Sequence, residues 1–173
     1  MSDERPQLRL VTSPESFEAF VQRRSVALQR FAYLLCHDRD EARDLVQDAF
    51  AGAYSRWDAL VRDGSPEAYL RRSIANGNIS RWRKLGRTTP VDPEHLRGSV
   101  PDQADAVVDA ELAWSLCREL PPAQRAAVVL RFYEDLDYAA ISEILDIPET
   151  TARSHVHRAL AALRLRVGGS THG

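Results

Sequence analysis

The sequence predicts an all-α protein made of two small helical domains joined by a flexible linker, and three observations support this. Apolar residues recur at spacings of three and four along most of the chain, and no strand-type alternation appears. Residues 86–104 hold prolines and glycines but few apolar residues, which is typical of a linker. The 173 residues, 44% hydrophobic and 28% charged, are enough for one or two globular domains.

The first domain is expected to span residues 14–85 as three helices. The first two helices cover about residues 14–36 and 39–57, and the apolar stripe of the second places Leu45, Val46, Phe50 and Tyr54 mostly in the core. The third helix opens at "SPEAYL" and continues to about residue 84. Its first residues follow N-terminal preferences, with Ser65 as N-cap and Pro66 at the first helical position.

The second domain, residues 105–166, is expected to hold four helices. They cover about residues 104–119, 122–134, 139–145 and 148–164, with Pro148 as the first residue of the last helix. The last two are separated by Asp146-Ile147-Pro148, because proline lacks a backbone donor and disfavours helical angles in the preceding residue. A short helix, a tight turn and a second helix form the helix-turn-helix pattern.

The last helix has a distinct outward face. Its inner stripe consists of Ala152, Val156, Ala159 and Leu163. The residues expected to face outward are Thr150, Thr151, Arg153, Ser154, His157 and Arg158. Such a donor-rich face suits the DNA major groove, although a helical hairpin with a solvated charged face explains the spacing equally well.

The net charge of −2 hides alternating blocks of opposite charge. Residues 71–87 contain six basic residues and no acidic one, whereas in residues 38–48 five acidic residues outnumber two arginines. The segment "RRSIANGNISRWRKLGR" interleaves arginines with Trp82, Asn76 and Asn78. Guanidinium groups neutralise phosphates, amides bond base edges and an indole can stack on a base, so this segment favours a DNA contact. The alternative is that Trp82 belongs to the core and the arginines only solubilise the helix.

The sequence offers little support for an enzyme, and neither a cofactor nor a metal is expected. It has no glycine-rich phosphate loop, nucleophile elbow or metal-binding histidine pair. His155 and His157 are two positions apart on a helix, so they point to opposite sides. Cys36 and Cys117 lie in apolar stretches and are expected to be small buried hydrophobes. No apolar run approaches the ~20 residues of a membrane span and no signal peptide is evident, so the chain is expected in the cytoplasm, away from membranes.

Three motifs give the chain a family resemblance. It resembles bacterial sigma factors of the sigma-70 family, specifically the small extracytoplasmic-function (ECF) group. "RDEARDLVQDAFAGAYSRW" is similar to the family's helix that binds core RNA polymerase, and "AYLRRSIANGNISRWRK" to the helix that reads and melts the minus-ten element. The stretch from Leu120 to Arg164 is similar to the domain that reads the minus-thirty-five element.

The resemblance implies a non-enzymatic transcription initiation factor that directs core polymerase to promoters and helps to open the DNA. Its implied partners are core RNA polymerase, double-stranded DNA at minus-thirty-five and melted DNA at minus-ten, and it leaves open whether an anti-sigma protein binds. The implied polymerase-binding residues are Asp44, Leu45, Gln47, Asp48 and Phe50. The implied minus-ten residues are Arg62, Arg72, Asn76, Ser80, Arg81 and Arg83. The implied minus-thirty-five residues are Thr150, Thr151, Arg153, Ser154, His157 and Arg158.

Three positions depart from the family pattern. Asp146 stands where glycine is usual, and a short polar side chain tolerates left-handed backbone angles better than most. Ser142 replaces the usual alanine, and Ser80 replaces a longer Asn or Asp. Two rival functions remain. One is a stand-alone helix-turn-helix regulator, which does not explain the acidic "DLVQD" helix. The other is an inhibitory module that binds polymerase without opening DNA.

Overall fold

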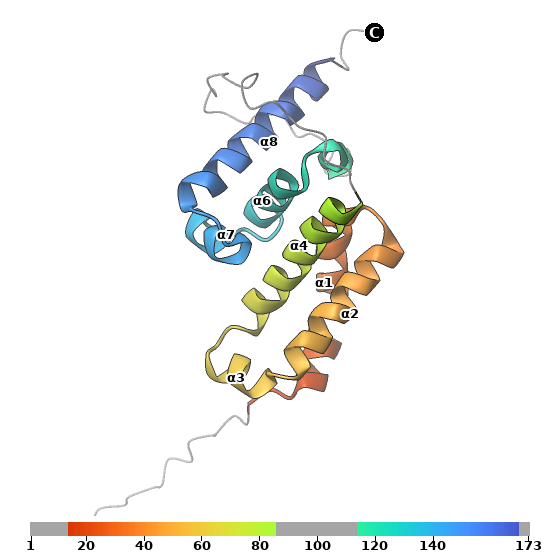
Figure 1. Cartoon of the computed structure of the whole chain (residues 1–173), viewed down its shortest axis with the longest axis vertical. Coiled ribbons are helices and arrows are strands. Elements are labelled where there is room, and N and C mark those ends of the chain that lie inside the picture. Colours follow the sequence, from red (N-terminus) through yellow and green to blue (C-terminus); the bar gives the residue numbers. More distant parts are fainter. Residues whose placement is uncertain (1–13, 86–113, 170–173) are drawn as a thin grey trace, which may run out of the picture.

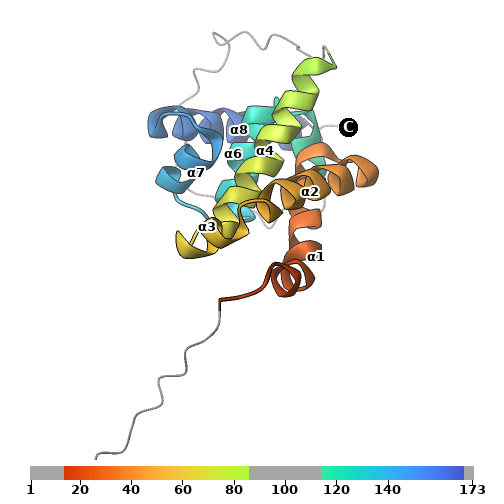
Figure 2. The same cartoon turned by 60° about the horizontal axis from the view of Figure 1, so that its bottom comes forward.

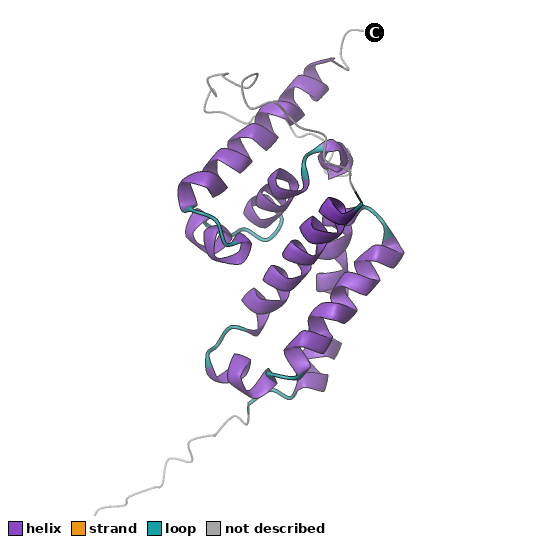
Figure 3. Ribbon diagram, in the orientation of Figure 1, coloured by secondary structure: helices purple, strands orange, loops and turns teal. Residues whose placement is uncertain are grey.

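The computed structural model describes residues 14–85 and 114–169, and within these two ranges every regular element is helical (Figures 1 and 3). The prediction of an all-α chain with two helical units is therefore confirmed. The expected linker and most of the helix expected near residues 104–119 lie outside the described residues. We refer to residues 14–85 as the N-terminal unit and to residues 114–169 as the C-terminal unit.

The N-terminal unit contains four helices rather than the expected three. They are α1 (Phe17–Cys36), α2 (Arg39–Tyr54), α3 (Trp57–Arg62) and α4 (Pro66–Lys84). The second expected helix ends early because the chain turns at Ser55, whose hydroxyl donates to the Gly52 carbonyl at 3.0 Å. Trp57 then packs edge-on against Phe17 and Phe20, and its indole N–H donates to the Glu15 carbonyl at 3.1 Å. Burial of this indole fixes the start of α3.

Side-chain caps begin two of the four helices in this unit, α1 and α2. Asp38 caps α2 by accepting from the backbone N–H groups of Asp40 and Glu41 at 2.9 and 2.8 Å. His37 ends α1 in the left-handed conformation, with φ 57°. Ser65 does precede α4 and Pro66 is its first residue, but the expected side-chain cap is wrong. At φ −123° and ψ 23°, the Ser65 hydroxyl makes no capping bond.

In the C-terminal unit, a short 3-10 helix is followed along the chain by three α-helices. The elements are η2 (Cys117–Glu119), α6 (Pro122–Phe132), α7 (Tyr138–Leu145) and α8 (Glu149–Gly169). Ile141, Ala152, Val156 and Ala159 are buried between α6, α7 and α8. Asp146 ends α7 at φ 53° and ψ 51°, which confirms that an aspartate here adopts the left-handed angles of the usual glycine.

The two units pack directly against each other, which the sequence did not indicate. Helix α4 lies against α6 and α7, and α1 lies against α6 and η2 (Figures 1 and 2). The buried apolar side chains of both units form one continuous cluster. Within the described ranges, no helix is long and apolar enough to cross a lipid bilayer.

His37 lies at this junction and makes the stability of the fold depend on pH. Burial, together with the positive charges of Arg125 and Arg118, lowers the pKa of His37 to about 4. Its Nε2 is buried without a hydrogen-bond partner among the described residues, and its surroundings include Cys36, Asp38 and Glu41. The unfolded chain therefore binds this proton more readily than the folded chain, so acidification favours unfolding.

We expect the folded chain to lose stability as the pH falls from about 6.5 to about 4 through protonation of His37. Because the ring is only half-buried, the loss should be about 1 kcal/mol and not the full conversion of the shift. His37→Asn suits the left-handed position and removes the titrating group. Urea denaturation of both proteins across this pH range should show a shallower loss for the variant. Parallel curves would contradict the assignment.

Candidate nucleic-acid interface

Helix α8 presents a polar face to solvent over its first two turns. Thr150, Arg153, Ser154 and His157 are exposed, whereas Ala152 and Val156 are buried against the unit. Thr151 and Arg158 are half-buried and lie at the edges of the polar face. The predicted division into an inner stripe and an outer face is thus present in the structure.

The arginine in the middle of this face is held only by weak surface contacts. The Arg153 guanidinium lies 4.4 Å from the centre of the Tyr138 ring, and its Nη2 is 3.4 Å from a Glu149 carboxylate oxygen. Exposed contacts of both kinds contribute at most about 1 kcal/mol each, so a nucleic acid can replace them. Cation–π contact with Tyr138, the first residue of α7, keeps the guanidinium beside the start of that helix.

The two histidines of α8 differ as their spacing predicted. His157 is exposed, whereas His155 is half-buried on another side of the helix. Burial, followed by the charge of Arg158, lowers the pKa of His155, so its ring stays neutral near pH 7. Only His157 is therefore available to a ligand on the outer face.

Hydrogen bonds fix the angle between α7 and α8. Asp137 caps α7 by accepting from the Ala140 N–H at 2.8 Å. The Ser142 hydroxyl donates to the Ile147 carbonyl at 2.6 Å, which ties α7 to the turn before α8. Serine therefore adds a bond at the position where the family usually has alanine. The polar face of α8 is held at a defined orientation relative to α7.

Helix α4 carries a second polar stripe. Arg72, Asn76, Ser80 and Arg83 are exposed at spacings of four, four and three, and so share one side of the helix. Arg62, the last residue of α3, is also exposed. Arg81 is half-buried and forms an ion pair with Asp48 at 2.9 Å, so it faces α2 instead. One of the predicted minus-ten residues is therefore held beside a predicted polymerase-binding residue.

Two other polar residues of α4 point into the protein. Asn78 is buried and donates to the Leu35 carbonyl at 3.4 Å, so its suggested role in reading bases is wrong. Trp82 is half-buried beside a hollow of about 310 Å³ that His37 and Arg118 also line. The helical period alone does not show that Asn78 and Trp82 face inward, because polar residues occur on both sides of α4.

Helix α2 presents an acidic face. Asp44, Gln47 and Asp48 are exposed. Leu45 is buried, and Phe50 is half-buried with its ring edge-on to Phe17 at 6.0 Å. These two residues support the face from the inside rather than forming its surface.

Tyr54 was expected mostly in the core, and this expectation is wrong. Its side chain is 65% exposed, and its ring contacts Phe17 edge-on at 5.2 Å. Tyr54 is the last residue of α2, where the chain turns away before neighbouring helices can cover it. An exposed aromatic residue beside an acidic face is a candidate binding residue that the periodicity concealed.

These features define a class of protein: a DNA-binding factor with a helix-turn-helix, a second basic helix and an acidic face on a third helix. Comparison with protein families then identifies the family of the chain. The model of sigma-70 region 2 matches residues 20–88, and that of sigma-70 region 4 matches residues 111–163. The chain belongs to the sigma-70 family, in its ECF group.

Known relatives support this membership along most of the chain. The RNA polymerase sigma-E factor of Streptomyces avermitilis is 36% identical over 149 residues, which cover 86% of this chain and 83% of that protein. The ECF RNA polymerase sigma factor SigW of Bacillus subtilis is 29% identical over 153 residues, covering 79% and 81%. The sigma factor RpoE of Bartonella quintana, solved with the anti-sigma factor NepR, matches with a TM-score of 0.66 and 25% identity over 88% of this chain and 96% of that one.

Proposed function

We propose that the two units divide the recognition of a promoter between them. In this proposal α8 reads the minus-thirty-five element, α4 and the end of α3 contact the minus-ten element, and α2 docks on core RNA polymerase. As an ECF sigma factor, the chain is a non-catalytic subunit that recognises promoters and initiates transcription with RNA polymerase. We further propose that it acts in the cytoplasm and that an anti-sigma protein can bind it, as NepR binds RpoE.

The exposed face of α8 carries this proposal. It combines hydroxyl, imidazole and guanidinium donors on one side of a helix that a hydrogen-bonded turn holds in place. A recognition helix enters the major groove with its N-terminal residues, and arginine bonds guanine there through two donors. Arg153 lies in that N-terminal half.

The stripe on α4 and the face of α2 support the other two roles. Arg72 and Arg83 flank two small polar side chains along α4, an arrangement that can bind a phosphate backbone and contact unpaired bases. On α2 the predicted docking residues Asp44, Gln47 and Asp48 are exposed and acidic or neutral, and the helix ends at the exposed Tyr54 ring. Two exposed arginines, Arg39 and Arg43, lie in the first turns of the same helix. Charged rims with an aromatic anchor are typical of protein–protein interfaces.

Run-off transcription with purified core polymerase on genomic fragments tests the proposal. A sigma factor produces discrete transcripts when it is the only factor added. A stand-alone helix-turn-helix regulator gives none without another sigma factor, and an inhibitory module lowers the yield that another sigma factor supports. Either of the last two results would overturn the proposed function.

Arg153→Ala is expected to flatten discrimination at one or two positions of the minus-thirty-five element, whereas Arg158→Ala should weaken binding to all sequences. Losing a base-edge contact costs about 1–3 kcal/mol at that base, and losing a phosphate contact lowers the salt slope by about one. The positions are five apart, so the two side chains diverge by roughly 140° and serve different surfaces. Arg158 is the half-buried one at the edge of the face.

The measurement is holoenzyme binding to a panel of single-base minus-thirty-five variants at two salt concentrations. Thr151→Ala, also at the edge of the face, is the control that measures how the loss of a smaller hydrogen-bond donor changes binding. If Arg153→Ala weakened binding to every sequence equally, α8 would not read bases through this residue.

A further inference from the structure

We propose that Tyr138 is a positioning residue for promoter reading. Its ring holds the Arg153 guanidinium by one face and leaves the N–H groups of that guanidinium free for a base edge. Tyr138 lies outside the residues assigned to the minus-thirty-five element, and it belongs to α7 rather than to α8. This role rests on the proposed function, in which Arg153 reads a base, and it determines how the guanidinium is presented to that base.

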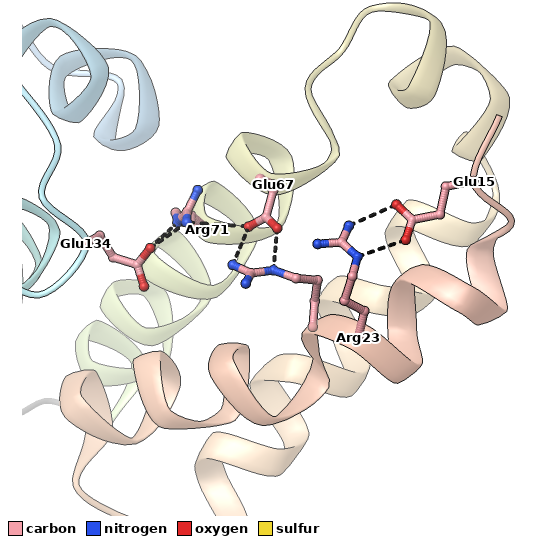
Figure 4. Close-up of polar contacts among 6 residues, drawn as sticks. Glu15, Arg23, Glu67, Arg71 and Glu134 are labelled. Atoms are coloured by element: carbon pink, nitrogen blue, oxygen red, sulfur yellow. Dashed lines mark hydrogen bonds and ion pairs between the residues drawn. The ribbon is translucent and has the colours of Figure 1, made fainter. Parts of the chain in front are cut away.

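Carboxylates hold several arginines of the described chain through their N–H groups. Figure 4 shows two examples: Arg23 donates to both oxygens of Glu15 at 2.9 and 2.8 Å, and Arg71 lies between Glu67 and Glu134. Donors used in this way reach another ligand only when the carboxylate is displaced. Arg23 and Arg71 therefore have few donors left for a nucleic acid.

Arg153 is held differently, because the face of an aromatic ring contacts it. Its Cζ lies 4.4 Å from the centre of the Tyr138 ring. A guanidinium over a ring is attracted through its flat face, whereas its N–H donors lie in the guanidinium plane and point outward. Guanine O6 and N7 accept such donors in a bidentate contact. The ring contact and a base contact can therefore exist at the same time.

Glu149 also contacts Arg153, but in a way that competes with a base. Its carboxylate oxygen lies 3.4 Å from Nη2 and so occupies a donor that a base would need, and both side chains are more than half exposed. An exposed ion pair at this distance is weak and is screened by salt. A base can displace Glu149 without disturbing the ring contact, so the ring and not the carboxylate orients the guanidinium in the complex.

The Tyr138 ring suits this role because the C-terminal unit holds it in place. The residue is half-buried at the start of α7, and the guanidinium of Arg131 in α6 lies 5.5 Å from the centre of the same ring. Arg131 also donates to the Leu136 carbonyl at 3.1 Å, and Asp137 caps α7 through the Ala140 N–H. A guanidinium that is already oriented loses less side-chain entropy on binding, and a bidentate contact requires a defined orientation. Loss of the ring should therefore weaken binding to the preferred base more than to the other bases.

The test variant is Tyr138→Leu, with Tyr138→Phe and Tyr133→Leu as controls. Holoenzyme binding is measured on the panel of single-base minus-thirty-five variants, built on a fragment active in run-off transcription. An exposed cation–π contact corresponds to a factor of about two to five, so Tyr138→Leu should lower the affinity ratio between preferred and other bases by about that factor. Phenylalanine keeps the ring and should keep the ratio. Tyr133→Leu makes the same change on an exposed ring that packs edge-on against Trp114, and should also keep it.

Two further measurements separate positioning from a structural effect. In the Arg153→Ala background, Tyr138→Leu should not lower the affinity ratio further, because the ring acts through that guanidinium. The second measurement needs neither a variant nor DNA. The NMR order parameter of the Arg153 Nε–H in the full wild-type chain should exceed that of Arg39, an exposed arginine without an ion pair or ring contact among the described residues.

An unchanged affinity ratio in Tyr138→Leu, or equal order parameters for Arg153 and Arg39, would overturn the positioning role and leave the proposed function intact. Equal losses in Tyr138→Leu and Tyr138→Phe would also overturn it, because the hydroxyl and not the ring would then be responsible. Equal losses in Tyr138→Leu and Tyr133→Leu would show a general effect on the unit and would overturn it too. If Arg153→Ala itself keeps every base preference, the proposed reading of bases by α8 fails, and the positioning role fails with it.

Discussion

Replacing Arg125 with methionine is expected to lower the free energy of unfolding by about 4 kcal/mol. Arg125 is only 6% exposed, and its guanidinium donates to the carbonyls of Cys117, Arg118 and Leu120 at 3.0, 2.8 and 2.9 Å. It also donates to the Leu35 carbonyl at the end of α1, across the junction between the units. Methionine keeps the stem while removing every donor. The Cys117 carbonyl keeps the Leu120 N–H and the Leu35 carbonyl keeps the Asn78 amide, so the main loss is at the carbonyls of Arg118 and Leu120. Each buried carbonyl left without a partner costs about 1–3 kcal/mol.

The charge is retained in this site because its surroundings suit a cation. Burial lowers the pKa of Arg125, yet guanidinium groups remain protonated even when desolvated. The Leu35 carbonyl belongs to the last turn of α1, where helix carbonyls lack partners and the helix dipole is negative. A neutral side chain without donors leaves the Leu35 carbonyl with only the longer bond from Asn78 at 3.4 Å.

Urea denaturation of the full chain measures the loss. Arg125→Lys keeps the charge but cannot reach four carbonyls from one ammonium group, so its loss should be intermediate. Arg118→Met removes an exposed arginine from the same surroundings and should change stability by no more than about 0.5 kcal/mol. If Arg125→Met and Arg118→Met unfolded at the same urea concentration, the bonds to the carbonyls would carry no net stability.

The parts of the fold that follow local rules could be predicted from the sequence. The start of α4 at Pro66, the turn before α8 and the tolerance for Asp146 each depend on residues within one or two helical turns. Helix α3 was missed because its start depends on Trp57 reaching the Glu15 carbonyl, a contact across 42 positions. The junction was missed for the same reason, since Arg125 and Leu35 are 90 positions apart and neither has a distinctive local pattern.

The candidate site was predictable where one side of a helix is uniformly apolar. In α8 small and branched apolar residues mark the inner side, so the exposed residues could be named. In α4 polar residues occur on every side, and Asn76 and Asn78 could not be separated into exposed and buried without the position of α1. Tyr54 fits the apolar period of α2, but a helix end has fewer neighbours to cover it.

Reversing the charge of Asp44 is expected to weaken binding to core RNA polymerase at least about thirtyfold, or about 2 kcal/mol. Asp44 lies in the middle of the exposed face of α2, beside Gln47 and Asp48. A charge of the wrong sign at an interface costs several kcal/mol when it meets a complementary surface. Because the side chain is exposed, Asp44→Arg should leave helical content and stability nearly unchanged.

Asp44 gives a sharper result than Asp48, because the Asp48 carboxylate pairs with Arg81 of α4 at 2.9 Å. Reversing Asp48 would repel Arg81 and disturb a residue assigned to the minus-ten element, so lost transcription could come from either surface. Among the described residues, Asp44 has no ion pair that would be broken in this way.

The control variant is Glu18→Arg on α1, which makes the same change of charge away from the face. Labelled core enzyme is titrated with the wild type, Asp44→Arg and Glu18→Arg. Only Asp44→Arg should show weakened binding. Equal affinities would remove α2 as the docking helix, and equal losses in Asp44→Arg and Glu18→Arg would show that net charge, not this face, determines binding.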